Sequence, residues 1–282
     1  GAFLIIRMSP IISYSEVALG ILAVIGLTTL ALASLVMLTQ TSIKVSLAWS
    51  TTAQMGFMLL ECGLGLYSLA MLHLVAHSLY KAHAFLSSGS GVDSFRSPTI
   101  ASNYSSFKPG QLIIALTSGG LMAIAVGFAF GITIQSEPAL IVAGTIVAIA
   151  LSQLLLQAAN VMSNAAFMLR ALILSAVICT AYFSLHTLFE MALHGSVLPV
   201  QNPAGFFEDT LAIAIVCVFL ALLLLQRMLR CGSSTLVGGL YVHFYNGLYI
   251  DVYITRLLQR VWPAPIYSTR TSPFATEKLT GD

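Results

Sequence analysis

The sequence has 282 residues, of which 58% are hydrophobic and 8% are charged, and its formal net charge is +2. Soluble domains carry about 25% charged residues, so this chain has too little polar surface to cover a water-soluble fold. The basic residues are also too few and too scattered for a protein that binds nucleic acid. We therefore expect an all-α membrane protein whose surroundings are mainly lipid.

The first eight residues, GAFLIIRM, have the character of a helix end rather than of a helix start. The sequence also begins with Gly1 rather than with methionine. We therefore expect the natural N-terminal part to be missing and the chain to be the C-terminal half of a longer protein.

Apolar runs of membrane-span length follow, because a helix needs about 20 apolar residues to cross a bilayer. Seven runs qualify: 17–38, 44–62, 66–88, 111–134, 138–158, 165–188 and 209–230. Only a few residues, around Gly63 and Gly65, separate the second run from the third. The sequence therefore predicts about seven transmembrane helices, with the second and third joined in a tight hairpin.

The second run carries polar side chains among its apolar residues. Ser50, Gln54 and Glu61 fall within about 40° of one another on a helix, which places them in one narrow stripe. They are candidates to hold water against the next helix or simply to hydrogen-bond to it. Lys44 begins this run and is either an interfacial anchor or part of an ion path. Glu61 lies at the other end, where it is either a supporting group or an interfacial charge.

The third run contains titratable side chains that are costly inside a bilayer. His73, His77 and Lys81 are each four residues apart, so on a helix they share one face and rise by about 6 Å per step. Histidine changes its protonation near neutral pH, and a lysine removed from water can release its proton. Water molecules can bridge such steps. We therefore predict a proton path along these three side chains, called here the histidine–lysine line.

Two other interpretations of this line remain open. A histidine in a membrane helix can serve only as a hydrogen-bonding partner of a neighbouring helix. Lys81 is near enough to the end of the run for its long side chain to extend to the membrane surface. His83 points to a different face of the same helix, and we expect it to have a structural or interfacial position.

The later runs offer fewer candidates. Polar residues gather around the turn at 158–165, namely Gln153, Gln157, Asn160, Asn164 and Arg170. His186 and Glu190 are one helical turn apart, which is typical of an ordinary surface pair, although a proton exit is the alternative. The four cysteines, Cys62, Cys179, Cys217 and Cys231, have no spacing typical of metal ligands, so we interpret them as packing residues.

The last part of the chain, residues 233–282, is polar and aromatic. The stretch GLYVHFYNGLYIDVYITRLLQRVWPAP has apolar residues at helical spacing until Pro263 and Pro265 end the pattern. It predicts an amphipathic helix that lies on the membrane surface or docks to a partner. We therefore divide the chain into a core at 1–92, further spans at 93–232 and an amphipathic tail at 233–282.

Charged residues alternate between the two ends of the predicted spans. One end and the tail carry the basic residues Lys44, Arg96, Lys108, Arg170, Arg227, Arg230, Arg256, Arg260, Arg270 and Lys278. The other end carries Glu16, Glu61, Glu137, Glu190, Glu208 and Asp209, with Arg7 as its one basic residue. Short cytoplasmic loops are enriched in Lys and Arg. We therefore expect a multi-pass protein of the cell inner membrane with a cytoplasmic C-terminus.

Two of these stretches resemble a known family. TQTSIKVSLAWSTTAQMGFMLLECGLG and LHLVAHSLYKAHAFLSSGS are similar to the core of the antiporter-like subunits of respiratory complex I, the subunit 5 family. That family has a lysine at a helix start, a Leu-Ala-Tyr/Trp-Ser-Thr stretch and a His-x-x-x-His-x-x-x-Lys motif. Lys44, His73, His77 and Lys81 match it position by position. The resemblance covers about residues 1–92 and implies one half of an inverted-repeat transporter fold that conducts protons.

The segments LAWSTTAQMGFMLLECGLGLYSLAMLHLVAHSLYKAHAFLSSGS and YVHFYNGLYID resemble one branch of that superfamily. It is the membrane subunit, DabB, of the DAB-type inorganic-carbon accumulating complexes. The resemblance implies a proton-conducting subunit of an energy-coupled carbon dioxide/bicarbonate pump. It also implies a large cytoplasmic zinc-containing partner akin to carbonic anhydrase (DabA type), with the zinc in the partner and no cofactor in this chain.

The sequence departs from the complex I pattern in one respect. Complex I subunits have a lysine in a later broken helix, whereas no lysine lies between 108 and 278 here. An NADH-quinone oxidoreductase-like subunit or a cation/proton antiporter is nevertheless an alternative function. A helical membrane anchor for a soluble enzyme is another. The sequence shows none of the common catalytic or nucleotide-binding motifs, so we expect a transporter subunit rather than an enzyme.

Overall fold

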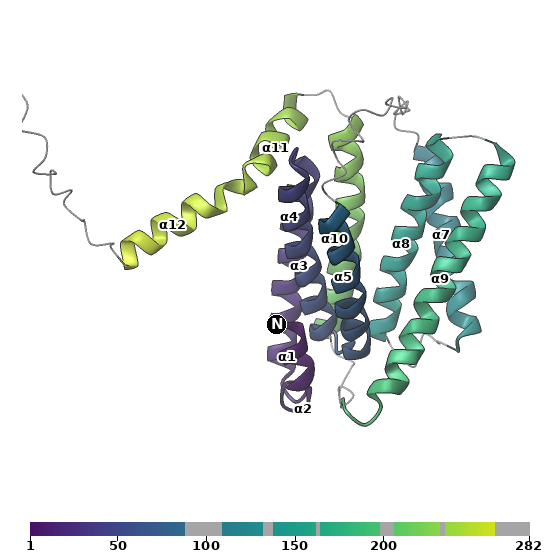
Figure 1. The fold of residues 1–282 in the computed structure, drawn as a ribbon, viewed down its shortest axis with the longest axis horizontal. Helices are drawn as coiled ribbons and strands as arrows, with labels where there is room; N and C mark the ends of the chain where they lie inside the picture. The colour runs from purple at the N-terminus through teal and green to yellow at the C-terminus, as the bar shows by residue number, and fades with distance from the viewer. Residues whose placement is uncertain (88–108, 132–137, 162–163, 198–205, 232–234, 263–282) are drawn as a thin grey trace, which may run out of the picture.

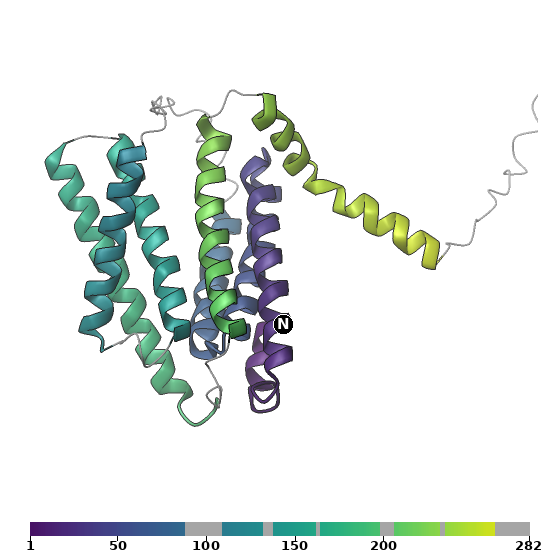
Figure 2. The same cartoon turned by 180° about the vertical axis from the view of Figure 1, so that it is seen from behind.

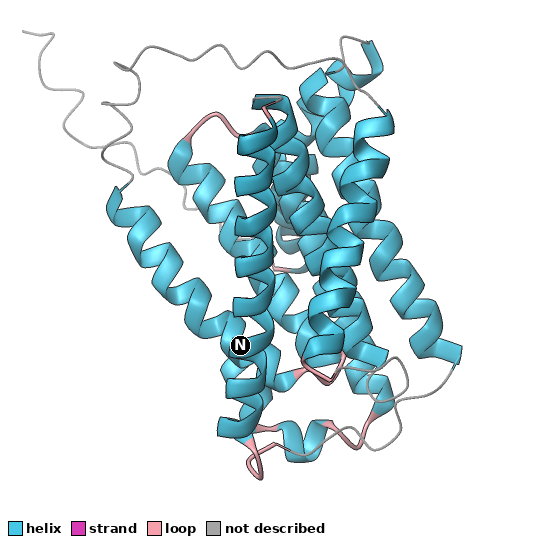
Figure 3. Ribbon diagram, turned by 90° about the vertical axis from the view of Figure 1, so that its right-hand side faces the viewer, coloured by secondary structure: helices cyan, strands magenta, loops and turns pink. Residues whose placement is uncertain are grey.

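The computed structural model describes residues 1–87, 109–131, 138–161, 164–197, 206–231 and 235–262, and all the regular structure in these ranges is helical (Figure 3). The first five helices are α1 (Ala2–Arg7), α2 (Ser9–Ile12), α3 (Glu16–Thr39), α4 (Ile43–Gly63) and α5 (Tyr67–Ser87). The next four are α7 (Pro109–Ala129), α8 (Pro138–Val161), α9 (Ala165–Leu193) and α10 (Phe206–Cys231). The tail forms α11 (Thr235–Tyr245), the short 3-10 helix η2 (Gly247–Tyr249) and α12 (Ile250–Val261).

The seven long helices α3, α4, α5, α7, α8, α9 and α10 occupy the seven runs predicted from the sequence. Five stretches of them are long and apolar enough to cross a membrane, within α3, α7, α8, α9 and α10. The other two, α4 and α5, are each 21 residues long and carry the polar side chains that lower their hydropathy. They lie beside the others in the bundle (Figures 1 and 2). The all-α membrane fold is confirmed.

Neighbouring helices run in opposite directions, so the bundle has a basic end and an acidic end. The basic end is defined by Lys44 and Arg170, near the starts of α4 and α9, and by Arg227 near the end of α10. The acidic end is defined by Glu16, at the start of α3, with Glu61 and Glu190 near the ends of α4 and α9. Arg96, Lys108, Glu137, Arg270 and Lys278 lie outside the described residues.

The hairpin between α4 and α5 is as tight as predicted. Only Leu64, Gly65 and Leu66 separate the two helices. Gly65 has a φ of 75°, a left-handed conformation that glycine adopts without the penalty of a Cβ atom. The turn therefore holds the last residues of α4 beside the first residues of α5.

Glycine also allows α3 and α4 to touch through their backbones. A Cβ atom on Gly26 would lie 2.5 Å from the amide nitrogen of Leu60 and 2.7 Å from the carbonyl oxygen of Gly56. A Cβ atom on Gly63 would lie 2.5 Å from the amide nitrogen of Ala23. Small residues support close approach of helices in membranes, where no hydrophobic force drives helices together. This contact fixes α4 against α3 and leaves the opposite face of α4 for α5.

The remaining helices complete the bundle around this pair. Helix α9 packs against α5, α7 and α8, while α10 packs against α3 and α8. Helix α1 packs against the end of α4 and the start of α5, where Ala2 and Ile6 join a core with Met58, Cys62 and Tyr67. The polar part of α4 and α5 is thus enclosed by helices from both halves of the chain.

The tail is helical as predicted, but it forms two helices instead of one. The break falls at Asn246–Gly247, after which Leu248 and Tyr249 have φ angles of 55° and 56°. An Asn-Gly pair is a turn signal, so the sequence contained the information for this break. Pro263 and Pro265 lie outside the described residues.

The two tail helices differ in their contacts. The Tyr241 hydroxyl of α11 donates to the carbonyl oxygen of Thr39 at 3.1 Å, and Gln40 Nε2 donates to the carbonyl oxygen of Tyr245 at 3.1 Å. These bonds hold α11 against the basic end. Every residue of α12 after Ile250 is exposed, and the helix projects away from the bundle (Figure 1).

Replacing Gly26 with alanine should destabilise the bundle. The added methyl group meets two backbone atoms that no side-chain rotation can move, so we expect a loss of about 1–3 kcal/mol. The measurement is the unfolding midpoint of the purified protein in detergent. Gly120→Ala is the matched control, because a Cβ atom at Gly120 has no neighbour within 4 Å. Equal midpoints for the two variants would contradict the close-contact interpretation.

Candidate functional site

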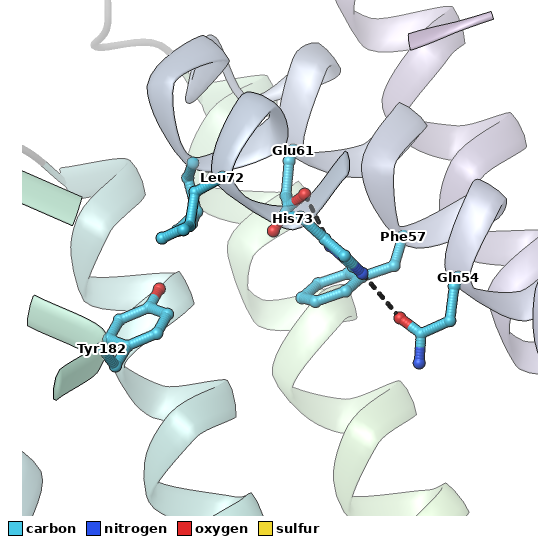
Figure 4. A pocket seen from close by; sticks show the side chains of 7 residues that line it. Gln54, Phe57, Glu61, Leu72, His73 and Tyr182 are labelled. Atoms are coloured by element: carbon cyan, nitrogen blue, oxygen red, sulfur yellow. Dashed lines mark hydrogen bonds and ion pairs between the residues drawn. The ribbon is translucent and has the colours of Figure 1, made fainter. Parts of the chain in front are cut away.

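The side chain of His73 on α5 bridges two polar side chains of α4. Its Nδ1 lies 3.0 Å from Glu61 Oε2, and its Nε2 lies 2.7 Å from Gln54 Oε1 (Figure 4). These three residues are called the His73 bridge. An imidazolium that donates from both ring nitrogens, with Glu61 as a carboxylate, fits this geometry. Moving the proton of Nδ1 to Oε2 gives a neutral histidine and a neutral carboxylic acid with the same heavy-atom geometry.

Glu61 is the buried member of the His73 bridge, while Gln54 and His73 are half-buried. The Glu61 residue is 3% exposed, and the rings of Phe57 and His73 meet edge to face with centroids 5.0 Å apart. Glu61 is therefore not the interfacial charge that its place near the end of α4 allowed. A buried charge is costly unless it is paired, and His73 supplies the pair.

The other two members of the histidine–lysine line continue along the same face of α5. The ring centroids of His73 and His77 are 6.3 Å apart, close to the step expected from their spacing. His77 Nε2 is buried and has no hydrogen-bond partner among the described residues. The two rings thus follow one another without a direct hydrogen bond.

Lys81 is buried at the basic end of the line. It is 6% exposed, and its Nζ donates to the carbonyl oxygen of Leu47 on α4 at 2.9 Å. The Thr51 hydroxyl donates to the same carbonyl oxygen at 2.9 Å. The Lys81 side chain is directed at the neighbouring helix, which differs from an extension to the membrane surface.

Only some of the polar residues predicted on α4 contact the histidines of α5. Gln54 and Glu61 contact His73, as described above, and Ser50 is half-buried one turn before Gln54. Lys44 is exposed in the first turn of α4, and within the described ranges no hydrogen bond joins Lys44 or Ser50 to the histidines. A part for these two residues in proton movement remains a prediction.

A pocket of about 240 Å³ adjoins the His73 bridge (Figure 4). It is lined by Gln54, Phe57, Glu61, Leu69, Leu72, His73 and Tyr182. Tyr182 belongs to α9 and enters from the side opposite α4. Sequence reasoning missed Tyr182, since no pattern in the sequence relates α9 to α5.

The remaining sequence candidates do not form a second site. His186 Nδ1 lies 3.9 Å from Glu190 Oε2, but His186 is buried whereas Glu190 is exposed, so the pair lies only half at the surface. Gln153 donates to Gln226 at 3.3 Å, and Arg170 and His83 are exposed. Among the described residues, no three His, Cys, Asp or Glu side chains are placed to hold a metal ion.

Comparison with known proteins finds a family similarity in the part of the chain that contains the histidine–lysine line. The family model described as "NADH:quinone oxidoreductase/Mrp antiporter, TM" matches residues 1–128. This part of the chain is thus similar to that antiporter-like family. The resemblance inferred from the motifs around Lys44 and His73 is thereby confirmed, and the whole histidine–lysine line lies inside the matched region.

Individual proteins are also similar to this chain. The chain is 40% identical over 278 residues to the probable inorganic carbon transporter subunit DabB2 of Halothiobacillus neapolitanus, a match that covers 94% of this chain and 48% of the relative. It is 58% identical over 94 residues to the DabB subunit of Hydrogenovibrio crunogenus, covering 33% of this chain and 18% of that protein. It is 38% identical over 113 residues to subunit L of NADH-quinone oxidoreductase from Rickettsia typhi, covering 40% and 16% respectively. The chain spans about half the length of DabB2.

Removing either end of the Gln54–His73 contact should weaken the packing of α4 on α5. A double-mutant cycle with Gln54→Ala and His73→Ala should give a coupling free energy of about 1 kcal/mol, typical of hydrogen bonds between membrane helices. The measurement is equilibrium unfolding in detergent. The control cycle uses Thr52→Ala with His73→Ala, because the Thr52 hydroxyl donates to the carbonyl oxygen of Ala48 in its own helix, at 3.3 Å, and to no other group among the described residues. If both cycles give the same coupling, the contact does not join the helices.

Proposed function

We propose that this chain is the proton-conducting part of the membrane subunit of an energy-coupled inorganic carbon pump. The observation that carries the proposal is a line of titratable side chains on one face of α5, from the buried Lys81 through the half-buried His77 and His73. Ionisable groups inside a membrane bundle are expensive and are usually kept for ion or proton movement. The similarity to two DabB subunits favours inorganic carbon as the transported material.

The spacing of the line suits proton transfer through water. Histidine can accept a proton on one ring nitrogen and release one from the other. We assign a water molecule to His77 Nε2, which has no hydrogen-bond partner among the described residues. The approach of the Lys81 ammonium group to a backbone carbonyl holds it on the line rather than at the surface. Protons would thus move between the basic end and the His73 bridge, with Lys44, Ser50, Gln54 and Glu61 as supporting groups.

The chemistry of carbon dioxide hydration would lie in a partner. We expect a large cytoplasmic zinc-containing subunit akin to carbonic anhydrase, while this chain itself is a transporter subunit without enzymatic activity. The exposed helix α12, with Arg256 and Arg260 beside its apolar residues, is the segment that we assign to docking. Docking to a cytoplasmic partner requires that the protein lies in the inner membrane with its basic end facing the cytoplasm.

A second candidate function is a proton-translocating subunit of an electron-transport complex or a cation/proton antiporter. The similarity to subunit L of NADH-quinone oxidoreductase favours it. Purifying the tagged full-length protein from membranes distinguishes the two. A large zinc-containing cytoplasmic partner favours the carbon pump, whereas co-purifying flavin and iron–sulfur subunits favour the electron-transport complex.

Neutralising the line should abolish transport. In the full-length protein, Lys81→Ala and His77→Ala should each lower bicarbonate accumulation at least tenfold, because each breaks the only run of titratable groups along α5. The measurement is uptake of labelled bicarbonate, with subunit assembly checked by co-purification. His83→Ala is the matched control, since His83 is exposed on another face of the same helix. Normal uptake in both line variants, with assembly intact, would leave the helical membrane anchor as the better interpretation.

The orientation has a separate test. A cysteine placed at Thr255 on α12, in a protein without its native cysteines, should react with a membrane-impermeant maleimide only in inside-out vesicles. A cysteine placed at Tyr14, which is 67% exposed and precedes Glu16 at the acidic end, should react in intact spheroplasts. The opposite labelling pattern would show that the basic end faces outward.

A further inference from the structure

The histidine–lysine line ends in a buried lysine, and a buried carboxylate adjoins its other end. Within the described part of the chain, the buried residues include one lysine and one carboxylate, Lys81 and Glu61. Lys81 bonds to Leu47 near the start of α4, and Glu61 bonds to His73 near its end. These two α4 residues are 14 positions apart, which corresponds to about 21 Å at 1.5 Å per residue. The run from Lys81 to Glu61 therefore covers most of a hydrocarbon core of about 30 Å.

Glu61 lies at the end of the line where protons would have to leave the bundle. Glu61 is two residues from the end of α4, and Leu69, on the other wall of the pocket, is two residues from the start of α5. The pocket thus lies at the acidic end of the bundle, beside the carboxylate (Figure 4). At about 30 Å³ per molecule in the liquid, its 240 Å³ has room for several water molecules.

We propose that Glu61 is itself a proton carrier, the last one of the line, and that the pocket between α4, α5 and α9 is its outlet. In the first step, the N–H bond at His73 Nδ1 breaks and an O–H bond forms at Glu61 Oε2. Imidazolium and carboxylate thereby become neutral imidazole and carboxylic acid. In the second step, the carboxylic acid gives its proton to a water molecule in the pocket and becomes a carboxylate again. A proton delivered along the line through water then binds to Nδ1 and restores the imidazolium.

The contacts of His73 support this sequence of steps. The distance of 3.0 Å between Nδ1 and Oε2 allows direct transfer without a change in backbone position. Gln54, at 2.7 Å from Nε2, holds the ring so that Nδ1 stays directed at Glu61. Tyr182 closes the pocket from α9 and carries a hydroxyl group that can bond to water there. Gln54 and Tyr182 are thus positioning residues in this scheme, while His73 and Glu61 carry the proton.

This inference rests on the proposed function, and the experiment separates the two. The full-length protein, purified with its partner subunits, is reconstituted into liposomes that contain a pH-sensitive dye. Glu61→Gln keeps the size of the side chain and an oxygen acceptor for His73 but cannot bind and release the proton. We expect proton flux at least tenfold below that of the natural protein, and partial recovery in Glu61→Asp. Glu16→Gln, an exposed carboxylate at the same end, is the control and should leave the flux unchanged.

A spectroscopic readout distinguishes a proton carrier from a structural residue. Infrared difference spectra recorded as the pH is changed should contain a protonated-carboxyl band that disappears in Glu61→Gln and persists in Glu16→Gln. If the natural protein conducts no protons, or Lys81→Ala conducts normally, the proposed function fails. If Lys81→Ala loses the flux while Glu61→Gln retains it, the line stands and the proton leaves by another route. Loss of flux with no Glu61-dependent band overturns the carrier assignment and leaves Glu61 as an anchor for His73.

Discussion

The backbone contact between α3 and α4 is the constraint on which the site depends. Gly26 and Gly56 let the two helices approach until a single methyl group would collide with the opposite backbone. At about 100° per residue, Gln54 and Glu61 lie about 140° to 160° around α4 from Gly56. Seating the glycine face on α3 therefore turns the polar face towards α5. Sterics on one side of α4 thus decide where the polar groups on its other side are placed.

The hairpin then sets the register between α4 and α5. Because Gly65 turns the chain within three residues, His73 is brought to the level of Glu61 and Gln54, and Lys81 to the level of Leu47. At this interface His73 and Lys81 find partners on α4, whereas His77 Nε2 and the Tyr67 hydroxyl have none among the described residues. The cost of burying charge is met locally, through an ion pair at one end and a carbonyl contact at the other.

The line also explains why α4 and α5 are the less apolar members of the bundle. Their polar residues face one another, while α1, α3 and α9 cover the pair from other sides. Mean hydropathy alone would not identify α4 and α5 as membrane-spanning helices. Of the seven long helices, the other five are long and apolar enough to meet that criterion. The two helices with the weakest membrane signal are thus the ones that carry the candidate chemistry.

The sequence by itself determined the helical membrane class, the seven long helices, the tight hairpin and the common face of His73, His77 and Lys81. These features depend on composition and on local periodicity, which a sequence contains in full. Only the tertiary structure decided that Glu61 is buried against His73, that Lys81 is directed at Leu47 and that Tyr182 lines the pocket. Such pairings depend on how far two helices approach and at what register. That distance is set by glycine contacts and by packing between segments more than 100 residues apart.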